Sequence, residues 1–161
     1  MRFLVLFLAL IISSCAFDPT IEYKVDDELE SIVDDFFQEA SIRGWIIEKK
    51  NLIVRLDDIK EHGLCYCNNE KEQKTIVINR KVVNENINVS DIHYNFVRLI
   101  VFHELGHWIG MNHRGPQKSI MNSSPSLGGC DCGDFIMMTR YANESSENQK
   151  KIIDELFGIS R

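Results

Sequence analysis

The fold of this 161-residue chain is decided by one stretch, HELGHWIGMNH, which runs from His103 to His113. Two histidines four residues apart on a helix differ by about 400° of rotation, so His103 and His107 project from nearly the same line one turn apart. Both imidazoles can therefore bind one metal ion. Glu104 lies about 100° round the helix from His103, which is too far to bind that ion directly but close enough to reach a water on it.

His113 can share this ion only if the helix ends before it. A helix continued to His113 would place that residue about 15 Å from His103, whereas zinc–imidazole bonds measure about 2 Å. We expect the helix to end at Gly110, because glycine adopts the left-handed conformation at a helix C-terminus without a Cβ penalty. Three neutral imidazoles with an open fourth position are typical of a catalytic zinc site rather than of a closed structural one.

The spacing His103-Glu104-x-x-His107-x-x-Gly110-x-x-His113 resembles the long zinc signature of the metzincin metalloproteases, whose second mark is a methionine turn beneath the metal. Such a turn is offered by Ser119-Ile120-Met121-Asn122, in which the methionine stands eight residues after the third histidine. The Ser-Ile-Met sequence and its short distance from the third histidine are most similar to those of the matrixins, the matrix-metalloprotease branch. The chain resembles a bacterial lipoprotein form of this branch.

This resemblance implies an α+β catalytic domain. A small twisted mixed sheet would pack on an N-terminal helix and an active-site helix, followed by the methionine turn and a C-terminal helix. The implied activity is that of a zinc-dependent endopeptidase, with Glu104 as general base and His103, His107 and His113 as ligands of Zn2+. Met121 would form an apolar floor under the imidazoles and not a ligand, since thioethers prefer softer metals.

Two other interpretations of the motif remain open. The chain could be a non-catalytic surface-binding lipoprotein that retains a protease-like zinc groove, although the intact Glu104 argues against this. It could also be a structural zinc module, but such a module needs a fourth protein ligand and none lies near in the sequence.

The first fourteen residues have the pattern of an export signal. Arg2 precedes the apolar run Phe3–Ile12, which is too short to cross about 30 Å of hydrocarbon as a helix. The ending Ile-Ser-Ser-Cys15 is similar to a bacterial lipobox, in which the cysteine is lipidated and becomes the first mature residue. We expect a signal peptide over residues 1–14, the lipidated Cys15 and a short tether over 15–20, and the catalytic domain over 21–161.

These features imply where the protein acts and what it meets. A lipid anchor would place it in the bacterial cell envelope, at the outer membrane if the cell has two, and secretion is the alternative. The formal charge of −6 and the pI of about 5.4 argue against nucleic-acid binding. The expected partners are a protein or peptide substrate and the membrane, and the chain is expected to be a monomer.

Four further cysteines form two C-x-C pairs, Cys65 with Cys67 and Cys130 with Cys132. Export to an oxidising space favours disulfides over thiols. Bridging within both pairs would close two small strained rings, so the two crossed connectivities are favoured. A tetrathiolate zinc site is the alternative, although C-x-C is tighter than the usual ligand spacing.

Strands and helices are expected on both sides of the metal motif. Alternating and β-branched residues predict strands, and apolar residues at three- and four-residue steps predict helices. The expected strands are Ile21–Val25, Trp45–Glu48, Asn51–Leu56, Gly63–Cys67 and Thr75–Arg80. The expected helices are Asp26–Arg43, one that follows the N-cap Ser90 and carries the motif, and one that Ser146 and Gln149 open as a capping box and Gly158 ends.

One of these strands is a candidate for substrate binding. In the metzincins the strand at this place is the sheet edge that pairs with an extended substrate, and Gly63, Leu64 and Cys65 are its candidates here. Main-chain hydrogen bonds would bind a peptide there by β-augmentation. An ordinary edge strand with a structural disulfide is the alternative.

Overall fold

The computed structural model describes residues 21–69, 71–113, 120–121 and 146–158. The expected signal peptide, the lipidated Cys15 and the tether lie outside these residues, as do Cys130 and Cys132.

The sheet has four strands in the order β1-β2-β4-β3. Their bounds are Tyr23–Val25 for β1, Leu52–Asp57 for β2, Gly63–Tyr66 for β3 and Thr75–Asn79 for β4. The first three in this order pair in parallel, and β3 pairs antiparallel with β4 at the edge of the sheet. The sheet is therefore mixed, as expected.

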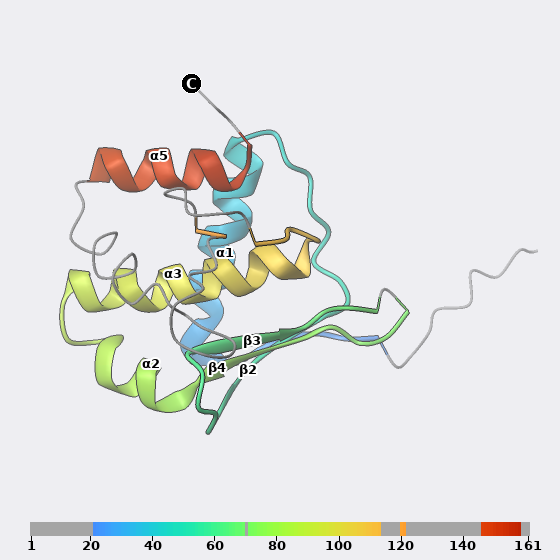
Figure 1. Cartoon of the computed structure of the whole chain (residues 1–161), viewed down its shortest axis with the longest axis horizontal. Helices are drawn as coiled ribbons and strands as arrows, with labels where there is room; N and C mark the ends of the chain where they lie inside the picture. Colours follow the sequence, from blue (N-terminus) through green and yellow to red (C-terminus); the bar gives the residue numbers. More distant parts are fainter. Residues whose placement is uncertain (1–20, 70, 114–119, 122–145, 159–161) are drawn as a thin grey trace, which may run out of the picture.

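Four helices accompany the sheet in the described residues: α1 (Asp27–Ile42), α2 (Arg80–Asn86), α3 (Asp91–Trp108) and α5 (Ser146–Leu156). In Figure 1, α3 lies between the sheet and α5, and α1 crosses behind it. The α+β class and the C-terminal helix predicted from the sequence are confirmed. Among the helices described, none is long and apolar enough to span a membrane.

The side chains that the sheet contributes to the helix-covered core lie two residues apart along its strands. Leu52, Val54 and Leu56 of β2 share a core with Ile76 and Ile78 of β4, and this core includes the buried residues of α1 and α3. Residues two apart on a strand project from the same face, so this is the face that the helices cover. The same register places Gly63 and Cys65 of β3 on the helix side.

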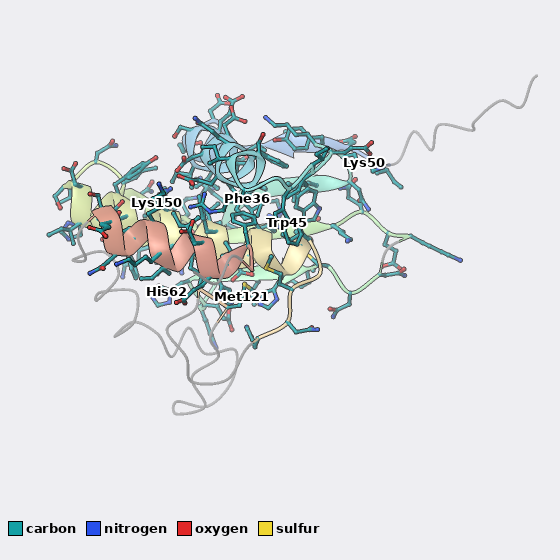
Figure 2. The ribbon with its side chains drawn as sticks, turned by 90° about the horizontal axis from the view of Figure 1, so that it is seen from above. Phe36, Trp45, Lys50, His62, Met121 and Lys150 are labelled. Atoms are coloured by element: carbon teal, nitrogen blue, oxygen red, sulfur yellow. A yellow bond between two sulfur atoms is a disulfide. The ribbon has the colours of Figure 1, made fainter. Side chains whose placement is uncertain are left out.

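Phe36 of α1 joins the three long helices. Its ring centroid lies 5.2 Å from that of Phe102 in α3 and 5.4 Å from that of Phe157, just beyond α5. Figure 2 shows Phe36 between α1 and α5. Offset and edge-on aromatic pairs at these distances stabilise packing beyond the area that they bury. The C-terminal helix is thus part of the same core as the helix that carries the metal motif.

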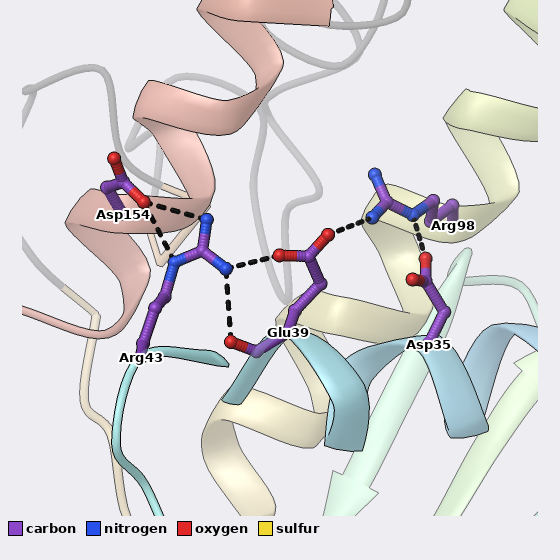
Figure 3. A network of polar contacts seen from close by, with 5 residues as sticks. All are labelled: Asp35, Glu39, Arg43, Arg98 and Asp154. Carbon is purple, nitrogen blue, oxygen red and sulfur yellow. Dashed lines mark hydrogen bonds and ion pairs between the residues drawn. The ribbon is translucent and has the colours of Figure 1, made fainter. Parts of the chain in front are cut away.

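A network of charged side chains links the same helices (Figure 3). Arg43, which is 3% exposed, contacts Glu39 of α1 and donates from Nε to Oδ1 of Asp154 in α5 at 2.9 Å. Arg98 of α3 donates to Asp35 of α1 at 2.6 Å. Buried guanidinium groups need such partners, because an unpaired buried charge is strongly destabilising. Both α3 and α5 are thereby anchored on α1.

The strand predicted at Trp45–Glu48 is wrong. After α1 the chain runs over the surface, where Ile46 is 98% exposed. The Trp45 indole N–H donates to the carbonyl oxygen of Phe157 at 3.1 Å. This segment is therefore fixed to the end of α5 and not to a neighbouring strand.

The helix α2 was not predicted. The strand expected to reach Arg80 ends at Asn79, whose side chain caps the new helix by accepting from the N–H of Lys81. The Asn79 amide nitrogen also donates to the carbonyl oxygens of Ile59 and Glu61. Asparagine is a favoured N-cap because its side-chain oxygen satisfies a free helical N–H.

Candidate metal centre

The helix α3 positions the first two histidines of the motif. It begins after Ser90, whose hydroxyl accepts from the N–H of His93, as the sequence predicted for an N-cap. Its residues are buried on more than one side, including Leu105 and Trp108 after the first histidine. A helix held in this way can present His103 and His107 in fixed directions.

The helix ends in a turn centred on Gly110, which has φ +88°. The N–H of Gly110 donates to the carbonyl oxygen of His107 at 3.0 Å, and the N–H of Met111 donates to that of Gly106 at 2.9 Å. This pair of bonds is the Schellman motif, which requires a left-handed residue where Gly110 stands. The turn reverses the chain and returns His113 to the face that carries the other two histidines.

The three Nε2 atoms converge on one point. His103 and His107 are 3.2 Å apart at these atoms, His107 and His113 are 3.0 Å apart, and His103 and His113 are 3.2 Å apart. A tetrahedral ion with bonds of 2.0–2.1 Å separates its ligand nitrogens by about 3.3 Å. The spacing therefore fits a zinc ion. In the part of the chain that the structure describes, this is the one group of three metal-ligating side chains.

Hydrogen bonds from the other ring nitrogen fix the tautomer of His103 and of His107. The Nδ1 of His103 lies 2.6 Å from the carbonyl oxygen of Ile120, and that of His107 lies 2.9 Å from that of Met111. A carbonyl oxygen can only accept a hydrogen bond, so each Nδ1 carries the ring proton and each Nε2 has a free lone pair. Two lone pairs cannot hydrogen-bond each other, and a cation between them satisfies both.

The charges of the site favour the neutral, ligating form of these rings. The pKa of His103 is lowered to about 4, chiefly by burial and in smaller part by the neighbouring His107 and His113, while the bond to Ile120 opposes the shift. Burial also lowers the pKa of His107. Neither ring needs to lose a proton near neutral pH before it binds a metal ion.

Glu104, which directly follows the first histidine of the group, is buried. Its side chain is 4% exposed, and burial raises its pKa to about 8. The carboxyl group lies against Gly63 at the start of β3, where an added Cβ would be 2.9 Å from its Oε1. The edge strand and the candidate base are thus in direct contact.

Met121 lies fully buried against α3. Its sulfur contacts the Cα side of Gly106, and a Cβ at that glycine would overlap the sulfur and lie 3.2 Å from Cε. Met121 therefore packs on the helix between the two histidines, close to the Ile120 carbonyl that orients His103. Gly106 was missed from the sequence. A glycine in a helix interior lowers helix stability by about 1 kcal/mol relative to alanine, and its presence there could have indicated a close packing contact.

The cysteine pairing differs from the one expected. The structure joins Cys65 to Cys67, whose Cα atoms are 5.4 Å apart, inside the usual range for a disulfide. The crossed pairings predicted for the two C-x-C pairs are therefore not found at Cys65 and Cys67. Residues two apart on an extended chain lie on one side of it, which brings these two sulfurs together.

The two remaining histidines lie apart from the metal group. The ring of His62 packs edge-on against Phe96, and Nδ1 of His93 lies 2.7 Å from the Ser90 hydroxyl. Neither belongs to the cluster formed by the motif histidines.

Comparisons with protein-family models, with curated proteins and with solved structures returned no match to this chain. The interpretation of the centre therefore rests on its own geometry: a three-histidine group next to a helix, compatible with a zinc site.

Proposed function

We propose that this protein is a zinc-dependent endopeptidase of the metzincin type, most similar to the matrixins. The observation that carries the proposal is the convergence of His103, His107 and His113 through Nε2, with Glu104 buried directly after the first of them on the same helix. A zinc ion bound there would polarise a scissile carbonyl and lower the pKa of a water towards 7.

Glu104 is the proposed general base. In the zinc-loaded protein the positive ion would favour the ionised form of this buried group, and its carboxylate would take the proton of the attacking water and pass it to the leaving amine. A structural zinc module is disfavoured because it needs a fourth protein ligand, and the cluster in the described residues has three. The burial of Glu104, directly after His103 on the same helix, supports a catalytic use of this residue.

The edge strand β3 is the proposed substrate-binding strand. The N–H of Asn79 donates to the carbonyl oxygen of His62, so this opposed pair is hydrogen-bonded across the ladder. Hydrogen-bonded and non-hydrogen-bonded pairs alternate in antiparallel sheets, so Gly63 and Cys65 direct their own N–H and C=O groups away from β4. A peptide could therefore add to this edge by β-augmentation next to Glu104.

A peptidase assay on the purified mature chain tests the proposal. With zinc bound, the wild-type protein should cleave casein or a quenched peptide library, and a chelator should abolish cleavage. Glu104→Ala should retain zinc and lose hydrolysis by several orders of magnitude. If Glu104→Ala cleaved at the normal rate, the base would be wrongly assigned. If the zinc-loaded wild-type chain bound peptides without cutting them, it would be a binding lipoprotein.

The setting proposed for this activity is the cell envelope. The lipobox-like ending at Cys15 supports lipid anchoring after removal of residues 1–14. The proposed partners are a peptide substrate and the membrane. The proposed enzyme is a monomer and binds no nucleic acid. Metabolic labelling with a fatty-acid analogue tests this, since Cys15→Ala should abolish incorporation.

A further inference from the structure

Gly63 is a glycine for reasons of space. The glycines at positions 44, 110 and 158 have positive φ angles, and an added Cβ at any of them would meet nothing within 4 Å. Gly63 has no such backbone requirement. An added Cβ at this residue would lie 2.9 Å from Cγ and from Oε1 of Glu104, and 3.0 Å from Cγ2 of Ile100. Because Gly63 has a hydrogen where other residues have Cβ, the Glu104 side chain can occupy this volume.

The strand could not retreat from a larger side chain. Its backbone pairs with β4 through the antiparallel ladder. The segment just before it is also fixed, because Asn79 donates hydrogen bonds to the carbonyl oxygens of Ile59, Glu61 and His62. Ile100 is 1% exposed and is packed in the core. Of the groups in contact, the Glu104 carboxyl group is the far end of a flexible side chain, so it would be the one to move.

The metal ligands are held independently of this contact. His103 is oriented by the carbonyl oxygen of Ile120 and His107 by that of Met111, and neither oxygen belongs to β3. A side chain at position 63 would therefore displace the carboxyl group without rotating the imidazoles.

We infer that Gly63 is a positioning residue for Glu104: the absence of a side chain at the start of the edge strand sets where the carboxyl group stands relative to the three histidines. This inference rests on the proposed function for its catalytic consequence. The contact itself can be tested without any activity. It links the strand proposed to bind substrate to the group proposed to move the proton.

Gly63→Ala and Gly63→Val test the catalytic consequence. Misplacing a catalytic group by about 1 Å can cost on the order of 100-fold in rate, so kcat should fall about 10- to 100-fold for alanine and further for valine. KM should change less than about threefold, because the main-chain groups of residue 63 remain available. Zinc affinity should also stay within about threefold, since the ligands keep their partners. Equal kcat in Gly63→Ala and wild type, or a kcat loss that follows lost zinc, would overturn the inference.

A double-mutant cycle tests the contact alone. Gly63→Ala should lower the Tm of the metal-free protein clearly, and it should lower the Tm much less when Glu104→Ala has already emptied the space. Additive effects, or a double variant that folds no better than Gly63→Ala, would contradict the inference even if the protein were no peptidase.

Val77→Ala is the matched control for general weakening of the sheet. Val77 is buried on β4 opposite Leu64, on the face that the helix core does not include. We expect Val77→Ala to lower the Tm, to add with Glu104→Ala in the cycle, and to leave kcat within about twofold, because Val77 lies on the other face of the sheet and sites that share no partners are usually additive. A lack of additivity here would show that any loss of sheet stability couples to Glu104, and would remove the support for Gly63.

Discussion

The Nδ1 of His103 lies 2.6 Å from the carbonyl oxygen of Ile120, seventeen residues further along the chain. This contact makes Ile120 part of the surroundings of the metal centre, although it is not one of the three ligands found in the described residues. It fixes the tautomer of a ring whose Nε2 faces the other two histidines. Ile120 contacts His103 through its carbonyl oxygen, and Met121 packs on Gly106 of the same helix.

Removing one imidazole should abolish tight metal binding. His107→Ala deletes the ring whose Nε2 lies within 3.2 Å of both others, so zinc affinity should fall by more than about 100-fold. Metal content by mass spectrometry and titration calorimetry measure this. His93→Ala is the control, since this residue is on the same helix but outside the cluster. Equal zinc content in His107→Ala and wild type would show that the metal binds elsewhere.

Gly106→Ala should weaken the centre in spite of a better helix former. On propensity alone this change in a helix interior would stabilise by about 1 kcal/mol. Here the new methyl group overlaps the Met121 sulfur, so Met121 and the adjoining Ile120 carbonyl must move. We expect a lower Tm and zinc affinity reduced about tenfold, because partners that orient ligands typically contribute 10- to 100-fold. A higher Tm with unchanged affinity would contradict this packing.

Glu104→Gln should stabilise the metal-free protein, and increasingly so at higher pH. The pKa of this carboxyl group is raised from 4.5 to about 8 by burial, so the unfolded chain ionises in a range where the folded chain stays protonated. The unfolded state then binds fewer protons, and stability falls as the pH rises from 4.5 to 8. Glutamine does not ionise, so the Tm difference should reach on the order of 10 °C at pH 8. Thermal unfolding in chelator between pH 5 and 8 measures it, and a constant difference would argue against a buried carboxyl group.

Lys74→Met should loosen the C-terminal end of α3. The Lys74 ammonium group donates to the carbonyl oxygen of Trp108 at 3.2 Å, where a helix end favours positive charge. We expect the Tm to fall by a few degrees, since such contacts contribute about 0.3–1 kcal/mol. Hydrogen exchange of the Ile109 and Gly110 amides should also become faster. Lys71→Met, an exposed position in the same connection, is the control and should change neither.

The local features of the centre could be predicted from the sequence. Four-residue spacing on a helix, an N-cap serine and a helix-ending glycine are properties of neighbouring residues, and the structure has each of them at Ser90, His103, His107 and Gly110. Most of the strands and the C-terminal helix also followed from apolar patterns, whereas the mixed sheet was expected from the resemblance to the metzincins. In each case the decisive interactions lie within one or two turns or one strand.

The features that were missed depend on residues far apart in the chain. The contact of Gly63 with Glu104 and that of Gly106 with Met121 arise only when strand, helix and turn are assembled. Trp45 has the β propensity that predicted a strand, but its indole N–H bonds to the carbonyl oxygen of Phe157. Local pattern could not reveal which of these partners the fold would bring together.

Because the turn at Gly110 reverses the chain, all three imidazoles of the centre can come from eleven consecutive residues. A chain without any tertiary structure keeps these donors close together, so it would retain measurable affinity for zinc. Binding to the denatured ensemble subtracts from the stability gained by the native state, so added metal should raise the melting temperature less than the native dissociation constant alone implies. The same proximity would let a nascent polypeptide capture its ion while the sheet is still unformed.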